Sequence, residues 1–159
     1  MLANIIEIDE AAMTISLKEK YGGLVLFDFK AAFPSESHEF LFETLEHLGM
    51  PRKELNLLKM LYHNNKCEIS FQGNTTPGFD ISAGIRQGCP LSPLMFAVTV
   101  DILLRRLQRL IPTGLFRAFA DDIGAVVDNF KESQTLLMQI FKEFGEISGL
   151  DLNLPKTIV

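Results

Sequence analysis

The sequence predicts an α+β domain in which helices pack on one face of an antiparallel sheet. Two patterns take turns along its 159 residues: short apolar runs that are typical of strands, and longer stretches whose apolar residues recur at helical spacing. Two pairs of strand-like runs are joined by turn-forming residues, which favours antiparallel hairpins. No internal repeat, low-complexity tract or linker divides the chain, so we expect one domain over residues 1–159.

The first half of the chain is expected to form a strand, two helices and a hairpin, over residues 22–29, 34–48, 51–62 and 66–82. The strand is a short apolar run that follows glycines and ends at Asp28, as is typical of a buried strand. Gly49 ends the first helix and Pro51 begins the second, which are the places that these residues favour at helix ends.

The predicted hairpin over residues 66–82 is expected to turn at Gly73-Asn74. Its first strand alternates apolar and polar side chains, and such alternation is typical of a strand with one buried face. The side chains expected to point inward are Cys67, Ile69 and Phe71.

The second half is expected to form a helix, a hairpin, another helix and a terminal strand-turn-strand segment, over residues 93–110, 115–128, 131–148 and 150–159. Ser92 suits the N-cap of the first helix, because its hydroxyl can accept from a free backbone amide, and Pro93 suits the first helical position. The last helix ends at Gly149. The side chains expected on its inward face are Leu137, Ile140, Phe144 and Ile147.

Composition and charge argue against several classes of protein. The net charge is −5, from 20 acidic and 15 basic residues, which argues against a free-standing nucleic-acid binder. Two cysteines without a Cys-x-x-Cys spacing indicate neither a zinc site nor a disulfide framework. The first 20 residues lack the basic start of a signal peptide, and the longest apolar stretch is too short to span a bilayer. We therefore expect an intracellular protein with no membrane partner.

Asp121 and Asp122 stand side by side at the turn of the second hairpin, between two apolar runs. Two carboxylates about 4 Å apart repel by about 4 kcal/mol at an effective dielectric of 20, a cost that an Asn-Gly turn would avoid. One interpretation is a solvated turn, because aspartate is common in turns. The other is a site that needs both charges.

A third carboxylate, Asp28, ends the first predicted strand. If that strand neighbours the hairpin of Asp121 and Asp122, three carboxylates converge, and divalent cations are their natural complement. Oxygen ligands suit Mg²⁺, and two such ions about 3.5–4 Å apart serve in-line phosphoryl transfer.

Four motifs appear in the order, and with roughly the spacing, that are found in the palm of reverse transcriptases. They are DFKAAFPS (28–35), GIRQGCPLSPLMFAV (84–98), FADD (119–122) and SGLDLNLPKT (148–157). The chain resembles this family over almost its whole length, and non-LTR retrotransposon enzymes in particular. The second motif is highly specific, and the third is a variant of the usual Tyr-Ala-Asp-Asp. The resemblance implies a polymerase palm that performs RNA-directed DNA synthesis.

The resemblance also implies a catalytic site. Asp28 and Asp121 correspond to the principal metal ligands, Asp122 to a supporting one, and Phe29 to a residue that offers its backbone carbonyl. The metal would be two Mg²⁺ ions, for which Mn²⁺ can substitute. Lys156 corresponds to a lysine near the leaving pyrophosphate, where a cation or proton donor stabilises developing charge.

The implied substrates are an RNA template, a DNA primer and deoxynucleoside triphosphates. Phe33 corresponds to the aromatic residue that packs under the sugar and excludes a 2′-hydroxyl. Arg86, Gln87 and Gly88 correspond to the loop along the template base and the incoming nucleotide.

The chain departs from the family pattern in two positions and in extent. Pro34 stands where an aspartate is usual, and Ala31 where a lysine is common. Only 27 residues precede Asp28 and three follow Lys156, so we expect a palm fragment whose fingers and thumb are largely absent.

Three rival interpretations remain. An RNA-dependent RNA polymerase tends to have glycine before the aspartate pair and a polar residue where Phe33 stands. A phosphoacceptor receiver domain also groups acids and a lysine around Mg²⁺, but there the acidic pair comes first in the chain. The last rival is a degenerate, non-catalytic domain that binds nucleic acid or a partner.

Overall fold

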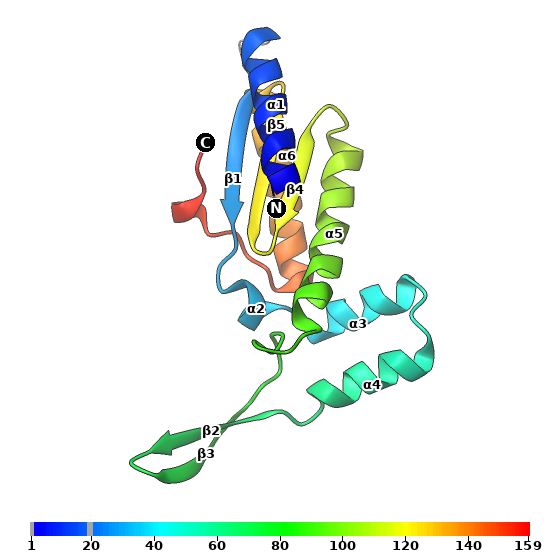
Figure 1. Ribbon diagram of the computed structural model, residues 1–159, viewed down its shortest axis with the longest axis vertical. Coiled ribbons are helices and arrows are strands. Elements are labelled where there is room, and N and C mark those ends of the chain that lie inside the picture. Colours follow the sequence, from blue (N-terminus) through cyan, green and yellow to red (C-terminus); the bar gives the residue numbers. More distant parts are fainter. Residues whose placement is uncertain (1, 19–20) are drawn as a thin grey trace.

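A three-stranded antiparallel sheet lies at the centre of the protein, in a computed structural model that describes residues 2–18 and 21–159. Its strands, in spatial order, are β1 (Gly23–Asp28), β5 (Asp122–Val127) and β4 (Leu115–Phe119). The first predicted strand and the second predicted hairpin thus join in one sheet (Figure 1). The α+β class and the antiparallel sheet are confirmed.

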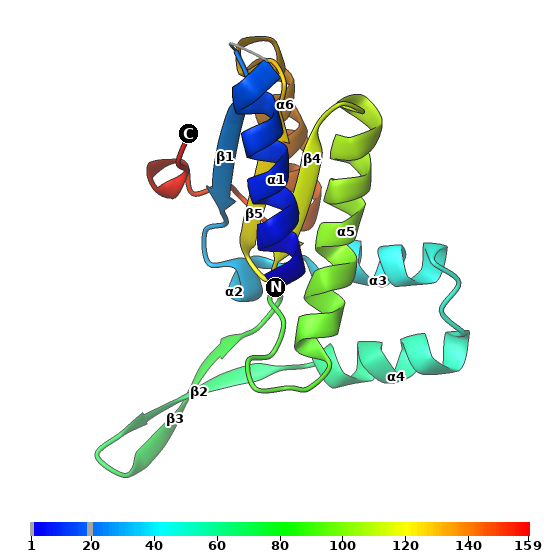
Figure 2. The ribbon, with the colours of Figure 1, turned by 45° about the horizontal axis from the view of Figure 1, so that its top comes forward.

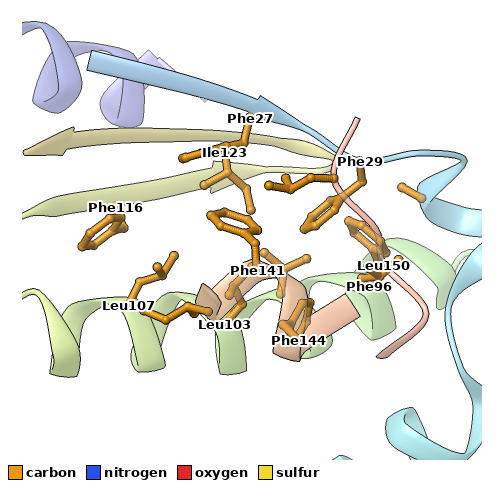
Figure 3. Close-up of a cluster of buried hydrophobic side chains, with 14 of the residues drawn as sticks. Phe27, Phe29, Phe96, Leu103, Leu107, Phe116, Ile123, Phe141, Phe144 and Leu150 are labelled. Atoms are coloured by element: carbon orange, nitrogen blue, oxygen red, sulfur yellow. The ribbon is translucent and has the colours of Figure 1, made fainter. Parts of the chain in front are cut away.

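One face of the sheet packs on two long helices, α5 (Ser92–Leu110) and α6 (Phe130–Ser148). Alternate residues of the strands point into this layer, and Figure 3 shows Phe27 and Ile123 above Phe141. The rings of Phe27 and Phe141 lie 4.4 Å apart, centroid to centroid. Truncating a buried phenylalanine such as Phe141 costs about 3–5 kcal/mol, so this layer dominates the stability of the domain.

The other face of the sheet carries α1 (Leu2–Lys18), which the sequence analysis did not predict. Successive residues of a strand point to opposite faces, so Gly124 faces away from the layer that Ile123 enters. A Cβ atom at Gly124 would lie 2.5 Å from the Cδ1 atom of Ile8, which shows how closely α1 approaches. The expectation that helices cover a single face is therefore corrected: Figures 1 and 2 show α1 and α6 on opposite sides of the sheet.

The single helix expected over residues 34–48 is two helices, α2 (Ala32–Ser35) and α3 (His38–His47). Glu36 breaks the run with extended backbone (ψ 126°), and the hydroxyl of Ser37 then caps α3 by accepting from the amide of Phe40 at 3.3 Å. The next helix, α4 (Arg52–Tyr62), occupies its expected range.

A two-stranded hairpin, β2 (Lys66–Phe71) and β3 (Asn74–Asp80), projects away from the sheet in both views (Figures 1 and 2). Gln72 and Gly73 both have positive φ, 46° and 79°, so the turn lies one residue before the predicted one. The prediction that Ile69 and Phe71 point inward is wrong, because they are 52% and 71% exposed. Alternation is present, but nothing in the described chain covers the apolar face of this hairpin.

Two expectations for the long helices are also corrected. Ser92 is the first residue of α5 rather than its N-cap, because its hydroxyl donates to the carbonyl of Arg86 at 2.5 Å. Ile147 of α6 is 53% exposed, whereas Leu137, Ile140 and Phe144 are buried as predicted. Gly149 ends α6 with a φ of 77°.

The final residues run along the free edge of β1. Leu152 bridges Phe29, Ile158 bridges Leu26, and a 3₁₀ turn, η1 (Leu154–Lys156), lies between the two bridges. The predicted strand-turn-strand segment is thereby realised as two short bridges.

Within residues 2–18 and 21–159, no helix has the length and apolar content to cross a membrane.

Candidate active site

The register of the sheet brings two of the three aspartates face to face. Asp28, the last residue of β1, is the direct antiparallel partner of Asp122, the first residue of β5. Asp121 precedes it in the connection between β4 and β5, where Ala120 has a left-handed φ of 53°. That conformation costs an L-residue on the order of 1 kcal/mol, and strain of this kind concentrates at functional sites.

One oxygen of the Asp28 carboxylate is held by the end of the chain. Its Oδ2 atom accepts a hydrogen bond from the side-chain amide of Asn153 at 3.0 Å and lies 3.4 Å from Nζ of Lys156. The Asp28 side chain is 19% exposed and that of Lys156 is 70% exposed. Sequence analysis named Lys156 but gave no role to Asn153, because an asparagine in a loop carries no signal of a contact so distant in the chain.

The donor atoms at this end of the sheet suit a hard cation. Asp28, Asp121 and Asp122 offer only oxygen ligands, which Mg²⁺ prefers. Phe29, the expected carbonyl ligand, follows Asp28, and its ring is buried against Phe141. Among the described residues, however, no three acidic, histidine or cysteine side chains lie close enough to form a preformed metal cage. A cation would have to draw these carboxylates together.

The four residues expected to bind substrate line one pocket. Phe33, Arg86, Gln87 and Gly88 border a cavity of about 400 Å³ between α2 and the loop before α5. Phe33 also borders a second cavity, of about 370 Å³, which reaches Ala120 beside the aspartates. A larger cavity, of about 590 Å³, lies at the base of the β2–β3 hairpin and contains none of the three aspartates.

Phe33 is held in place by a stacked aromatic neighbour. Its ring lies 4.8 Å from the ring of Phe96, with an angle of 17° between the two planes. Phe96 itself is 1% exposed and belongs to the core of α5, so it offers a rigid base. An aromatic ring fixed in this way forms a firm pocket wall.

The loop before α5 is held in place by Arg86. The Arg86 guanidinium donates to the side-chain oxygen of Asn65 and lies 5.8 Å from the ring centroid of Tyr62, so it is anchored to the end of α4.

In the same pocket, a hydrogen bond from the amide of Leu91 lowers the pKa of the Cys89 thiol, with smaller contributions from Ser92 and Arg86.

The fold is shared with solved telomerase structures. A telomerase of Candida albicans, solved with a fragment of telomeric RNA, superposes with a TM-score of 0.75 at 16% identity, over 99% of this chain and 30% of that one. An apo telomerase of Candida tropicalis gives a TM-score of 0.70 at 15% identity, over 97% of this chain and 33% of that one.

The chain belongs to the family described as reverse transcriptase (RNA-dependent DNA polymerase), which matches residues 2–159. A Pol polyprotein of the R2DM element of Drosophila melanogaster is 31% identical over 81% of the chain, and one of an R2 element of Nasonia vitripennis is 33% identical over 81%. The resemblance to non-LTR retrotransposon enzymes is thus confirmed. The chain spans only 13% and 12% of the lengths of these two relatives.

Proposed function

We propose that residues 1–159 are the palm domain of an RNA-directed DNA polymerase of a non-LTR retroelement, which adds deoxynucleotides to a primer 3′-hydroxyl on an RNA template. The observation that carries the proposal is the pairing of Asp28 with Asp122 beside Asp121, at one end of a sheet whose fold is shared with telomerases. In this proposal fingers and thumb lie outside these residues, in a longer protein like the R2 relatives.

The three aspartates, with the carbonyl of Phe29, would hold two Mg²⁺ ions, or Mn²⁺ in their place. When bound, the ions would activate the primer hydroxyl and stabilise charge on the leaving pyrophosphate. Lys156 is exposed enough to turn from Asp28 towards that pyrophosphate, where its ammonium group stabilises charge or donates a proton.

The remaining residues position the nucleotide. Phe33, which stacks on Phe96, would form a wall against the sugar and exclude a 2′-hydroxyl. Arg86, Gln87 and Gly88 line the same pocket and would lie along the template base and the incoming nucleotide. Holding nucleotide and primer end in a reactive geometry can contribute about 7–11 kcal/mol to catalysis.

A second candidate function is a non-catalytic domain that binds nucleic acid or a protein partner. It is favoured by the absence of a three-ligand cluster among the described residues, together with the engagement of Asp28 by Asn153 and Lys156. The first function requires the three aspartates for DNA synthesis, whereas the second involves no synthesis.

Primer extension separates the two. The chain is joined to the fingers and thumb of an R2 relative, and extension of a DNA primer on RNA is measured with and without Asp121→Asn. We expect extension that Asp121→Asn abolishes and that Asp9→Asn, the same charge change on an exposed position of α1, leaves intact. Template binding without extension, or extension that survives Asp121→Asn, would contradict the proposal.

A further inference from the structure

We propose that Asn153 is a positioning residue for Asp28, one that fixes the carboxylate through a single oxygen and turns the other towards the cation site. This inference rests on the proposed function, because it concerns the same aspartate. Asn153 belongs to the SGLDLNLPKT segment, in which only Lys156 has been given a role.

The backbone sets the place of Asn153. Its amide donates to the carbonyl of Asp28 at 2.8 Å, and the amide of Lys30 donates to the carbonyl of Asp151 at 2.8 Å. These two bonds flank the bridge between Phe29 and Leu152, so the segment extends the sheet for one step beyond β1. Asn153 therefore lies beside Asp28 independently of what its side chain does.

The backbone carbonyl of Asn153 fixes the turn that follows. It accepts from the amides of Lys156 and Thr157, at 3.0 and 3.1 Å, and from the hydroxyl of Thr157 at 3.2 Å. This turn is η1, and it brings the Lys156 ammonium back towards Asp28. Asn153 thus determines the position of both groups that contact the Asp28 carboxylate, its own side-chain amide and the Lys156 ammonium.

The chemistry of the contact fixes its direction. An ionised carboxylate only accepts hydrogen bonds, so the atom of Asn153 that faces Asp28 must be the amide nitrogen. Asn129 provides the contrast: its side-chain oxygen accepts from the amide of Glu132 and caps α6. An aspartate at position 129 could still accept this hydrogen bond, whereas an aspartate at position 153 could not donate to Asp28.

The carboxylate is held asymmetrically. Asn153 and Lys156 both approach Oδ2, whereas no side chain in the described part of the protein donates a hydrogen bond to Oδ1. Lys156 alone would fix the group poorly, because a 70% exposed ammonium is mobile. Asn153 is short and held by its backbone, so it selects one orientation of the carboxylate. Residues that orient a metal ligand typically change metal affinity by about 10–100-fold when they are removed.

The contact itself is tested without metal. The side-chain amide signal of Asn153, assigned by its loss in Asn153→Asp, is followed by NMR in the 159-residue chain. We expect Asp28→Ala to shift this signal upfield and Asp122→Ala to leave it in place, because only Asp28 accepts the bond. A signal that moves with neither variant, or equally with both, would overturn the inference.

The positioning role is tested with Mn²⁺ alone, by EPR titration of the same chain. We expect Asn153→Ala to weaken binding by about 10–100-fold, while Asn129→Ala, which removes a helix cap, does not. Unchanged affinity in Asn153→Ala would overturn the role. Binding that also survives Asp28→Ala would contradict the proposed function itself, and the NMR result would then show separately whether the contact exists.

Discussion

Asp28 lies directly opposite Asp122 in the antiparallel pair of β1 and β5, one residue from the turn that carries Asp121. The Cβ atoms of such partners are about 4.5–5.5 Å apart, and like charges in this arrangement destabilise a sheet. The sheet therefore carries electrostatic repulsion at this end, which the exposed Lys156 ammonium offsets only in part and a bound metal cation would relieve further.

This repulsion predicts that Asp122→Asn stabilises the chain when metal is absent and weakens the stabilisation that metal gives. In EDTA, Asp122→Asn should raise the free energy of unfolding by about 0.2–1 kcal/mol, because it removes one of two facing charges. In millimolar Mg²⁺, the same variant should gain less in melting temperature than the unmodified chain. Thermal melts under both conditions measure this, with Asp9→Asn as the charge-matched control. A variant that is less stable in EDTA would contradict the prediction.

The stacking of Phe33 on Phe96 predicts sugar selection. In the chain joined to R2 fingers and thumb, Phe33→Ala should improve incorporation of ribonucleotides relative to deoxynucleotides by about 10-fold or more, since it opens the pocket wall. Single-nucleotide extension with each sugar measures the ratio. Phe71→Ala, on the exposed hairpin, should leave the ratio unchanged. Equal ratios in both variants would assign Phe33 to the core instead.

The buried carboxyl of Glu36 predicts a pH dependence. Burial raises the pKa of Glu36 from its ordinary 4.5 to about 7, against the opposing hydrogen bond from the Thr99 hydroxyl. Its Oε2 atom has no hydrogen-bond partner in the described structure. Between pH 4.5 and 7 the unfolded chain releases this proton and the folded chain keeps it, so stability falls as pH rises.

The loss attributable to Glu36 should be on the order of 3 kcal/mol between pH 4.5 and pH 8. Glu36→Gln keeps the acceptor for Thr99 and removes the buried charge, so it should be more stable than the unmodified chain at pH 8 and lack this decline. Urea unfolding at a series of pH values measures the difference. Glu46→Gln, on an exposed position of α3, should behave like the unmodified chain. A parallel decline in Glu36→Gln would refute the assignment.

The exposure of the β2–β3 hairpin predicts that it contributes little to the stability of the rest of the domain. Lys66 pairs with Asp80, so residues 67–79 can be replaced by an Asn-Gly turn that joins the two. Because this hairpin buries almost no side chain, the melting temperature should change by no more than about 4 °C, the equivalent of about 1 kcal/mol. Phe141→Ala, in the core, should cost about 3–5 kcal/mol in the same assay. A comparable loss on hairpin replacement would show that the hairpin is coupled to the core.

Much of the fold could be predicted because periodicity is local. The strand ending at Asp28 and the hairpin around Asp121 are short apolar runs bounded by turns, and their order along the chain matched motifs of the family. Alternation shows which side chains share a face, but not whether anything covers that face. Phe71 was therefore misplaced: it was expected to point inward, but it is 71% exposed.

The parts that were missed depend on distant contacts. The helix over residues 34–48 breaks at Glu36, whose carboxyl reaches Thr99, 63 residues away. Asn153 reaches Asp28 across 125 residues, and nothing near either residue signals the contact. The α1 helix buries no side chain fully, and it lies against β4 and β5, which are distant from it in the sequence.

The attachment of residues 151–158 to the edge of β1 has a consequence for synthesis on the ribosome. Asp28 leaves the exit tunnel long before Asp122, and Asn153 comes later still, so the three stretches become available in that order. Contacts of such long sequence separation form slowly, because a large loop must close first. The contacts that orient Asp28 can thus form only after Asn153 and Lys156 have been synthesised. A nascent chain that stalls before residue 151 would display the sheet and its charges without the segment that orients them.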